Sequence, residues 1–347
     1  MNLFDTLARY GFGELHACRD EKTGLRALVG LYSNRLGPAI GGTRIRAYPS
    51  EADAIEDVLR LARAMAYKAA LAKLPHGGGK AVILAPSDGV FDRISLFRRF
   101  GEFVDGLGGR YVTTEDSGTS PSDMDIVREV TRHVVGSSGG SGDPSPFTAL
   151  GVRRGIEAVA RSWLDRDGLK GLKVALQGVG HVGTHLGREL VQGGAEITLT
   201  DVDPARRASV AAELGARAVE PEAIFDVPCD IFSPNALGGA ISEETVSRLR
   251  CRAVAGAANN QLATVEVGHA LHARKIFYAP DYAINAGGLI NVAVEYAGYD
   301  GERARRETLA IHDTIAEIID RSRREDTPPG EIADRMAEEI LERGSTR

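Results

Sequence analysis

Cysteine is scarce in this chain of 347 residues, and the three cysteines, Cys18, Cys229 and Cys251, lie far apart. None belongs to a CxxC pair or to a Cys/His pattern with the spacing of zinc ligands. An odd number of scattered cysteines argues against a disulfide framework and against a zinc site. We therefore predict no metal site, and we expect the cysteines to be small buried apolar side chains.

Long apolar runs and a surplus of basic residues are lacking as well. No segment approaches the roughly 20 apolar residues that a membrane-spanning helix needs, and the N-terminus has no apolar stretch of signal-peptide length. This predicts a cytoplasmic protein without a membrane partner. The net charge is −6, and lysine and arginine are dispersed rather than gathered in a stripe, which argues against a nucleic-acid partner.

The remaining composition is ordinary for a globular enzyme, with 43% apolar and 26% charged residues. At this length two domains of roughly 150 residues, with a cleft between them, are more plausible than one core. The sequence SSGGSGDPSP, residues 137–146, is the strongest shift in composition and suits a hinge. We place residues 1–137, together with C-terminal helices at about 326–347, in one domain and residues 138–325 in the other.

The first half predicts one long helix, followed by a glycine-rich turn and a strand. Ser50 and Asp53 form a capping box. Lys68 lies near the C-terminal end of the helix, and LPHGGGK then predicts a turn with a close approach of backbones, leading to Lys80 and the strand-like run AVILA. The apolar residues that predict the buried face of the helix are Ile55, Val58, Leu59, Ala62, Met65 and Ala66.

The second half begins with a dinucleotide-binding pattern. LKVALQ reads as a strand, GVGHVGTHLGRELVQGG as a glycine loop and a helix, and AEITLTD as a second strand ending in Asp201. Gly178, Gly180 and Gly183 permit the tight turn and the approach of a pyrophosphate to the start of the helix. The carboxylate of Asp201 would accept hydrogen bonds from ribose hydroxyls, which favours NAD over NADP.

Further alternation of helix and strand follows. Arg206 and Arg207, which could accommodate a 2′-phosphate instead, begin a helix in PARRASVAAEL, and DIFSP, CRAVAGAA and KIFYAP read as strands. This pattern predicts an open, mostly parallel, Rossmann-type α/β sheet with helices on both faces. Residues from about 301 to 345 are charged and helix-prone, are broken only at TPPG, and are expected to pack back on the first domain.

Taken together, these motifs resemble the glutamate/leucine/phenylalanine/valine dehydrogenases. The resemblance covers nearly the whole chain, in the family's order and spacing, through the blocks GPAIGGTR, MAYKAALAKLPHGGGKAVI, GGRYVTTEDSGT, QGVGHVG, GAANNQL and YAPDYAINAGGLINV. It implies an α/β substrate-binding and oligomerisation domain beside the dinucleotide-binding domain. It also implies NAD-dependent oxidative deamination of an L-amino acid to a 2-oxo acid and ammonia by a homo-oligomer, whether dimer, hexamer or octamer.

The resemblance assigns the catalytic roles. Lys80 is the lysine of lowered pKa that activates water, Asp116 moves protons to and from the amino nitrogen, and Lys68 holds the substrate carboxylate. Desolvation and neighbouring cations both disfavour the ammonium form of a lysine in a closing cleft, so such a lysine is a usable base. Each residue taken alone has a structural explanation: a solvated lysine, a turn-forming carboxylate before Ser117 and Gly118, and a lysine that interacts with the helix dipole.

The same resemblance extends to the cofactor and the substrate amine. His181 and Val182, between the glycines of the loop, are counted with the cofactor-binding residues. Asn260 corresponds to a residue near the substrate, and Asn285 and Thr148 correspond to residues near the nicotinamide. Their structural alternatives are an ordinary turn residue for asparagine and a helix-start residue for Thr148.

The positions that line the family's side-chain pocket are almost wholly apolar here: Ile40 beside Gly41, then Thr114, Leu289 and Val292. Enzymes that take glutamate are expected to place a lysine and a serine at this end of the pocket. Without them a buried glutamate carboxylate would be unpaired, so glutamate is disfavoured.

The pocket residues discriminate less clearly among the apolar amino acids. Leu289 stands where the leucine enzymes tend to carry valine, and Thr114 where they tend to carry alanine. One methylene changes discrimination by only roughly 1 to 3 kcal/mol. We predict a branched-chain aliphatic substrate such as leucine or valine, with phenylalanine as the alternative. A non-catalytic NAD-binding sensor or assembly protein is the alternative from another class, since a fold alone does not establish activity.

Overall fold

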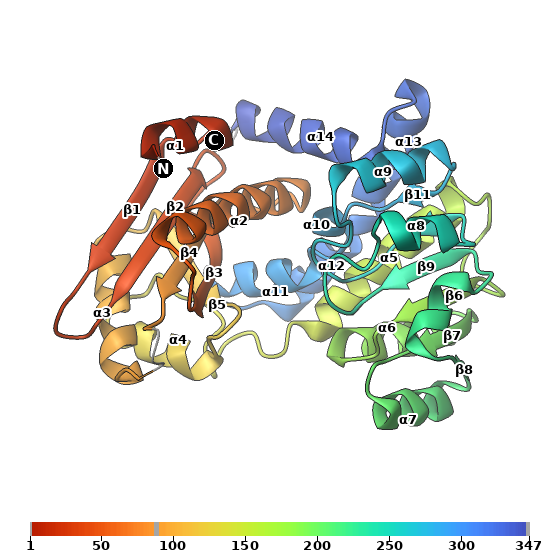
Figure 1. The fold of residues 1–347 in the computed structure, drawn as a ribbon, viewed down its shortest axis with the longest axis horizontal. Coiled ribbons are helices and arrows are strands. Elements are labelled where there is room, and N and C mark those ends of the chain that lie inside the picture. The colour runs from red at the N-terminus through yellow and green to blue at the C-terminus, as the bar shows by residue number, and fades with distance from the viewer. Residues whose placement is uncertain (1, 87–89, 345–347) are drawn as a thin grey trace. The chain divides into compact units, whose positions relative to one another are not determined.

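The computed structural model describes residues 2–86 and 90–344, and its contacts divide it into two compact units (Figure 1). Residues 345–347 of the expected C-terminal helical segment lie outside the described residues. Among the helices that are described, none is long and apolar enough to cross a membrane. The first unit comprises Met1–Gly142, Val292–Gly301 and Ala337–Arg347, and the second comprises Asp143–Asn291 and Glu302–Met336.

The first unit is a mixed five-stranded sheet in the order β1-β2-β4-β3-β5, with helices on both faces (Figure 1). The pairs β1/β2 and β2/β4 are antiparallel, whereas β3 pairs in parallel with β4 and with β5. The elements are α1 (Leu3–Tyr10), β1 (Glu14–Arg19), β2 (Arg26–Ser33), β3 (Ala39–Arg46), α2 (Glu51–Leu71), β4 (Gly77–Leu84), α3 (Arg93–Asp105), β5 (Tyr111–Glu115) and α4 (Pro121–Arg128).

Strand β4 supplies residues to two cores, because successive side chains of a strand point to opposite faces. Ala81 and Ile83 pack in the cluster that α3 and α4 cover, and Val82 and Leu84 pack in the cluster that α1 and α2 cover. The predicted helix is α2, where the Ser50 hydroxyl accepts a hydrogen bond from the Asp53 amide. Its predicted apolar face is buried, with Ile55 and Met65 half-buried at its margin.

The three glycines of LPHGGGK lie within β4, so the prediction of a turn at these residues is wrong. The expected close approach of backbones is confirmed. A Cβ atom at Gly77 would lie 1.7 Å from the carbonyl oxygen of Ser33, and one at Gly78 would lie 2.0 Å from the amide nitrogen of Ala66. The glycines are therefore required because β2 and α2 press against the strand.

The second unit contains a six-stranded, wholly parallel sheet in the order β11-β10-β9-β6-β7-β8, which confirms the predicted Rossmann-type arrangement. Helices cover both faces: Ala175 packs with η1, α8 and α9, whereas the next residue, Leu176, faces Gly187 of α6. The strands are β6 (Lys173–Gln177), β7 (Glu196–Thr200), β8 (Arg217–Ala218), β9 (Ile231–Pro234), β10 (Ala253–Val254) and β11 (Phe277–Tyr278).

Helices make up the rest of the chain. Beyond the expected break at TPPG, the tail is also interrupted at Ala310, between α12 and α13. The return of the tail to the first unit is confirmed for α14 from Ala337 onward, where the Tyr67 hydroxyl of α2 donates a hydrogen bond of 2.5 Å to Glu338. The helices are α5 (Ser145–Ser162), α6 (His181–Gln192), α7 (Pro204–Leu214), η1 (Pro221–Asp226), α8 (Glu243–Arg248), α9 (Val265–Ala273), α10 (Asp281–Ile284), α11 (Gly287–Glu295), α12 (Gly301–Leu309), α13 (Ile311–Glu325) and α14 (Pro329–Arg343).

One buried carboxylate holds the start of the glycine- and serine-rich segment. Oε2 of Glu295 accepts hydrogen bonds of 3.0 Å from the amides of Gly136 and Ser141, and Oε1 accepts one of 2.7 Å from Arg128. A Cβ atom at Gly140 would lie 2.5 Å from the same carboxylate. Hydrogen bonds to a charged group contribute about 1.5 to 3 kcal/mol each, so this part of the segment is fixed to the first unit.

The cysteines are free thiols in the interior or partly buried. Burial raises the pKa of Cys229 to about 12 and the pKa of Cys251 to about 11. Since the thiolate is the reactive form, both side chains are chemically inert near neutral pH and act as apolar packing groups.

Candidate active site

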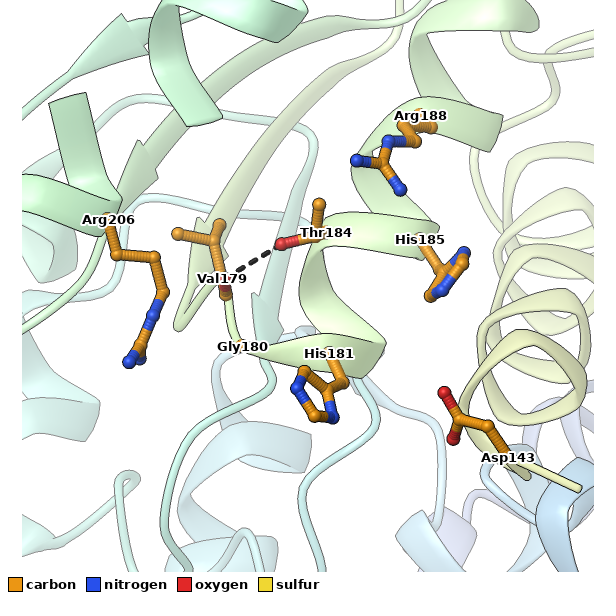
Figure 2. Close-up of a pocket in the computed structure, with 8 residues that line it drawn as sticks. All are labelled: Asp143, Val179, Gly180, His181, Thr184, His185, Arg188 and Arg206. Carbon is orange, nitrogen blue, oxygen red and sulfur yellow. Dashed lines mark hydrogen bonds between the residues drawn. The ribbon is translucent and has the colours of Figure 1, made fainter. Parts of the chain in front are cut away.

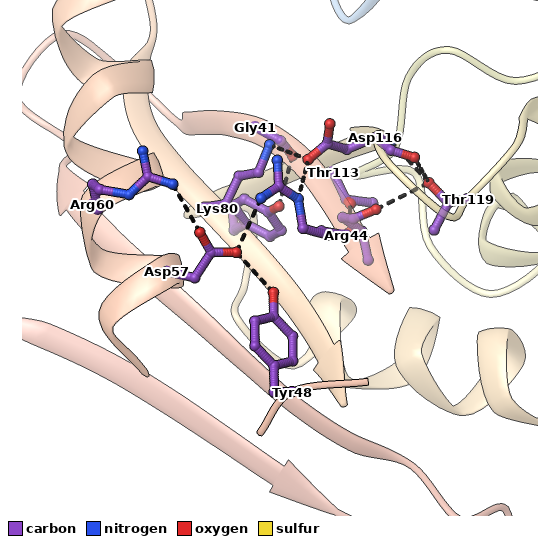
Figure 3. Close-up of polar contacts among 11 residues, drawn as sticks. Gly41, Arg44, Tyr48, Asp57, Arg60, Lys80, Thr113, Asp116 and Thr119 are labelled. Carbon is purple, nitrogen blue, oxygen red and sulfur yellow. Dashed lines mark hydrogen bonds and ion pairs between the residues drawn. The ribbon is translucent and has the colours of Figure 1, made fainter. Parts of the chain in front are cut away.

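A buried ion pair lies in the first unit between β4 and the end of β5 (Figure 3). Nζ of Lys80 lies 2.7 Å from Oδ2 of Asp116, and the two side chains are 7% and 24% exposed. Lys80 is in β4, and Asp116 directly follows β5. Both strands run parallel to β3, which separates them. Two residues 36 positions apart in the sequence are thus brought into direct contact.

The turn after β5 is closed by Thr119 and the backbone, so the Asp116 carboxylate can bind Lys80. The Thr119 hydroxyl accepts a hydrogen bond of 2.8 Å from the Asp116 amide, and the Thr119 amide donates one of 2.9 Å to the Asp116 carbonyl. Gly118 has φ +83°, and a Cβ atom there would lie 2.2 Å from the Ile45 carbonyl oxygen. Thr119 and Gly118 shape this turn, so the Asp116 side chain does more than form a turn.

Arg44 of β3 is a third member of the site, and the sequence analysis did not identify it. Its Nε lies 3.2 Å from Oδ2 of Asp116, and its NH1 lies 3.0 Å from Oδ2 of Asp57 on α2. Asp57 also accepts hydrogen bonds of 2.8 Å from the Tyr48 hydroxyl and 3.0 Å from Arg60. The only sequence signals were a carboxylate at position 57, one residue before the buried Val58 of α2, and an arginine in strand β3.

Opposing effects set the ionisation of the pair. Burial lowers the pKa of Lys80 below its ordinary value, Asp116 opposes that shift, and Arg44 adds to it. Burial alone would raise the pKa of Asp116, but Lys80 and Arg44 outweigh it and hold that pKa below the usual range. The result is a stable carboxylate beside an amine that releases its proton more easily than an exposed lysine does. Such a pair can exchange protons with a small molecule.

The glycine loop of the second unit borders a cavity of about 560 Å³ (Figure 2). Gly178 has φ +91°, and a Cβ atom at Gly183 would lie 2.2 Å from the Gly178 carbonyl oxygen, so both positions need glycine. A Cβ atom at Gly180 would meet no atom within 4 Å, and α6 begins at the next residue. The residues that line the cavity are Asp143, Val179, Gly180, His181, Thr184, His185, Arg188 and Arg206.

The loop and cavity fit the pyrophosphate of a dinucleotide, because a helix N-terminus and a backbone without side chains favour a bound phosphate. His181 is exposed at the first position of α6, and Val182 is half-buried behind it. Figure 2 shows His181 and His185 on the same side of this helix, near Asp143.

Asp201 is bonded to the loop itself. Its Oδ2 accepts a hydrogen bond of 2.9 Å from the Val179 amide, and its Oδ1 accepts one of 2.9 Å from the Asp203 amide. Arg206 lies 3.4 Å from Oδ1, and the Asp201 residue is 6% exposed. The neighbouring Arg207 donates a hydrogen bond of 3.3 Å to the Asp201 backbone carbonyl and one of 2.6 Å to Glu220. Asp201 thus supports the fold of the glycine loop, and Arg206 shields its charge.

Three further predicted residues lie in the second unit. Asn285 is 5% exposed and donates hydrogen bonds of 2.9 Å to the Ala257 carbonyl and 2.8 Å to Asn259. Its buried Oδ1 has no hydrogen-bond partner among the described residues, which leaves an acceptor for a ligand. Asn260 is exposed with φ +51°, and its amide is bonded to Asp281. Thr148 is half-buried in the first turn of α5, where its hydroxyl bonds to the backbone.

The predicted substrate-pocket residues of the first unit cluster on β3 and β5. Ile40 is fully buried, the carbonyl of Gly41 accepts a 2.6 Å hydrogen bond from a tyrosine on β5, and Thr114 is 9% exposed. Lys68 is half-buried in the last turn of α2, the helix that presses on Gly78 of β4. Val292, in the first unit, and Leu289, in the second, are both half-buried.

Metal-ligating side chains do not gather anywhere in residues 2–86 and 90–344: no group of three or more histidine, cysteine, aspartate or glutamate side chains there could hold a metal ion.

Comparison with known proteins places these features in a family. A model described as "Glu/Leu/Phe/Val dehydrogenase, dimerisation domain" matches residues 14–133, and one described as "Glutamate/Leucine/Phenylalanine/Valine dehydrogenase" matches residues 198–308. The chain is 47% identical to leucine dehydrogenase from Thermoactinomyces intermedius over 346 residues, covering 99% of this chain and 94% of that protein. It is 42% identical to phenylalanine dehydrogenase from the same organism over 348 residues, covering 99% and 94%. The crystal structure of L-tryptophan dehydrogenase from Nostoc punctiforme superposes with a TM-score of 0.90 at 39% identity, covering 98% of both chains.

Proposed function

The chain belongs to the glutamate/leucine/phenylalanine/valine dehydrogenase family and is an amino-acid dehydrogenase, and we propose that it catalyses the NAD-dependent oxidative deamination of leucine or a similar branched-chain L-amino acid. The reaction consumes water, and the products are the 2-oxo acid, ammonium, NADH and a proton. This proposal is supported mainly by the contact of 2.7 Å between Nζ of Lys80 and Oδ2 of Asp116. It places a base and a proton carrier side by side.

Each residue of the first unit has one task in this proposal. Lys68 binds the substrate carboxylate. Asp116 takes a proton from the substrate ammonium group and later returns one to the leaving ammonia. Lys80, whose pKa is lowered by burial, removes a proton from the water that attacks the imine carbon. Because Lys80 and Asp116 are in contact, a proton taken by one is readily passed to the other.

The second unit provides the residues for the cofactor. Gly178, Gly180 and Gly183 would hold the pyrophosphate at the start of α6, with His181 and Val182 beside it, and Asp201 would lie against the adenosine ribose. When bound, NAD supplies the hydride acceptor for the substrate Cα. The buried, unpaired Oδ1 of Asn285 would accept a hydrogen bond from the nicotinamide amide, and we retain Thr148 as a proposed cofactor-binding residue and Asn260 as a proposed substrate-binding residue.

We also propose which domain binds the substrate and which binds the cofactor. Residues 1–137, with the C-terminal helices at about 326–347, bind the substrate and form the subunit contacts, and residues 138–325 bind the dinucleotide. The match of residues 14–133 to a dimerisation domain supports assembly into a homo-oligomer.

Apolar side chains at the substrate positions support an aliphatic substrate. Ile40 is fully buried, and neither Thr114 nor Val292 offers a cation to a substrate carboxylate. Phenylalanine is the second candidate, since relatives that act on phenylalanine and tryptophan are nearly as similar to this chain as the leucine enzyme is.

The test is a substrate panel with the purified protein, in which NADH formation at alkaline pH is followed with leucine, valine, phenylalanine, tryptophan and glutamate. We expect the highest kcat/KM with leucine or valine and no turnover with glutamate, because a buried carboxylate without a partner is costly. Highest activity with phenylalanine would favour the second candidate. NAD binding without turnover of any amino acid would contradict the proposal and favour a sensor or assembly protein.

Arg206 is predicted to weaken the preference for NAD. Its guanidinium neutralises Asp201 at 3.4 Å and lies at the wall of the cavity, where a 2′-phosphate would meet it. Arg206→Ala should therefore raise the ratio of kcat/KM with NAD to that with NADP by roughly tenfold, since a hydrogen bond to a charged group contributes about 1.5 kcal/mol or more. Arg250→Ala removes an exposed arginine that does not line this cavity and is the control. An unchanged ratio in Arg206→Ala would contradict the prediction.

A further inference from the structure

Resting on the proposed function, we infer that Arg44 is a positioning residue that fixes the Asp116 carboxylate against Lys80, and that Asp57 in turn fixes Arg44. Neither residue forms a hydrogen bond or an ion pair with Lys80. Their effect on the reaction is therefore exerted through Asp116 and through charge.

The first observation is the shared oxygen. Oδ2 of Asp116 receives both Nζ of Lys80, at 2.7 Å, and Nε of Arg44, at 3.2 Å. Two cations on one oxygen restrict rotation of the carboxylate more than either could alone. A lysine at position 44 would keep the charge but lose the planar fork that reaches two carboxylates at once.

The second observation is the chain of alternating charges behind the pair (Figure 3). Arg44 extends its NH1 to Asp57 at 3.0 Å, and Asp57 is held by Arg60 at 3.0 Å and by the Tyr48 hydroxyl at 2.8 Å. The side chains of Arg44 and Asp57 are only 18% and 13% exposed. Charges removed from water to this extent need partners with good geometry, and each of these has at least two.

The third observation is that these two charges act on Lys80 in opposite directions. Burial lowers the pKa of Lys80 most strongly, Asp116 opposes this, Arg44 lowers that pKa further, and Asp57 raises it. The charged and titratable groups that face Lys80 or its partners are Asp116 after β5, the buried Tyr111 on β5, Arg44 on β3, Tyr48 before α2, and Asp57 and Arg60 on α2. Burial raises the pKa of Tyr111, so its hydroxyl remains neutral over the pH range in which the enzyme is assayed.

The experiment compares Arg44→Met and Asp57→Asn with the wild type in the pH dependence of kcat/KM for leucine. Loss of the cation should move the midpoint of the rising limb to higher pH, and loss of the anion should move it to lower pH, each by roughly 0.5 to 1 pH unit for a partly screened charge. Arg44→Met should also lower kcat, because the Asp116 carboxylate loses one of its two partners. Arg44→Lys should return the midpoint toward that of the wild type while kcat stays low, because lysine restores the charge but not the planar fork. A midpoint that recovers while kcat does not would distinguish the effect of the charge at position 44 from the effect of the arginine's planar fork on Asp116.

An exposed ion pair between α1 and α2 gives matched controls. Arg9 and Glu56 lie 2.5 Å apart and are 58% and 49% exposed, so Arg9→Met and Glu56→Gln change the net charge equally, away from the site. Both should leave the midpoint unchanged. Midpoints that move in the same direction in Arg44→Met and Asp57→Asn, or that do not move while kcat falls, would show a merely structural role and overturn the inference.

A measurement without turnover keeps this inference separate from the proposed function. The rate at which Lys80 is acetylated by acetic anhydride, followed by mass spectrometry across pH, reports the ionisation of its amine directly. We expect the same opposite shifts in the two variants. Opposite shifts in a protein that oxidises no amino acid would leave the positioning inference standing and refute the proposed function, whereas unmoved labelling midpoints in an active enzyme would refute the inference alone.

Discussion

Lys80→Met is expected to lower kcat for leucine oxidation by roughly 10² to 10⁴, the usual contribution of a general acid–base group. Methionine keeps much of the length of the buried side chain but cannot accept a proton from water. KM should change less than kcat, because the substrate carboxylate is assigned to Lys68 and not to Lys80. Steady-state rates over a range of leucine concentrations, at the pH optimum of the wild type, measure both constants.

A fall in rate could also come from loss of structure, since removing one partner of a buried ion pair costs about 3 to 5 kcal/mol. The double variant Lys80→Met with Asp116→Asn removes both charges and provides the control. It should regain much of the Tm lost in Lys80→Met but none of the activity. A folded Lys80→Met protein that turns over at nearly the wild-type rate would contradict the assigned role.

Local sequence patterns were sufficient to predict several helices and strands of the fold. The expected helix start at Ser50 and the apolar stripe after it were sufficient for α2, because a helix on a core must bury one face at helical spacing; of the predicted capping box, the bond from the Asp53 amide to the Ser50 hydroxyl is present. The glycine loop between two strands was likewise sufficient for β6, α6 and β7. Both features depend on residues that are close in sequence.

The three glycines before Lys80 show where a prediction from the local sequence alone is wrong. A run of glycines is typical of a turn, but here each position is small because another element presses on it, as the amide of Ala66 does on Gly78. That pressure comes from β2 at Gly77, from α2 at Gly78 and from the Tyr111 ring of β5 at Gly79. It has no signature in the glycine segment itself.

The sequence analysis named Lys80 and Asp116, which the structure brings into contact, but missed Arg44 and Asp57 behind them. Lys80 and Asp116 belong to recognisable blocks, whereas the contact of Arg44 with Asp57 joins a strand to a helix and depends on how the two pack. Asp201 is an intermediate case. Its place at the end of β7 was predicted, but its hydrogen bond to Val179 depends on the loop conformation.

Asp116→Asn is expected to lower kcat by a factor comparable to that of Lys80→Met, roughly 10² to 10⁴, because the amide keeps the shape of the carboxylate but cannot carry a proton. The variant has a second effect. Asp116 opposes the lowering of the pKa of Lys80, so its removal leaves burial and Arg44 unopposed and lowers that pKa further. The rising limb of the pH profile should therefore move to lower pH even though the maximum rate falls.

These two effects separate the two roles that we propose for Asp116. If its carboxylate only tuned Lys80, the variant would have a shifted midpoint and a nearly normal maximum rate. If the carboxylate only carried protons, the rate would fall with an unchanged midpoint. The contact of 2.7 Å between Lys80 and Asp116 couples both functions in one hydrogen bond, so we expect both changes together. A pH–rate profile of Asp116→Asn that lacked either change would contradict this coupling.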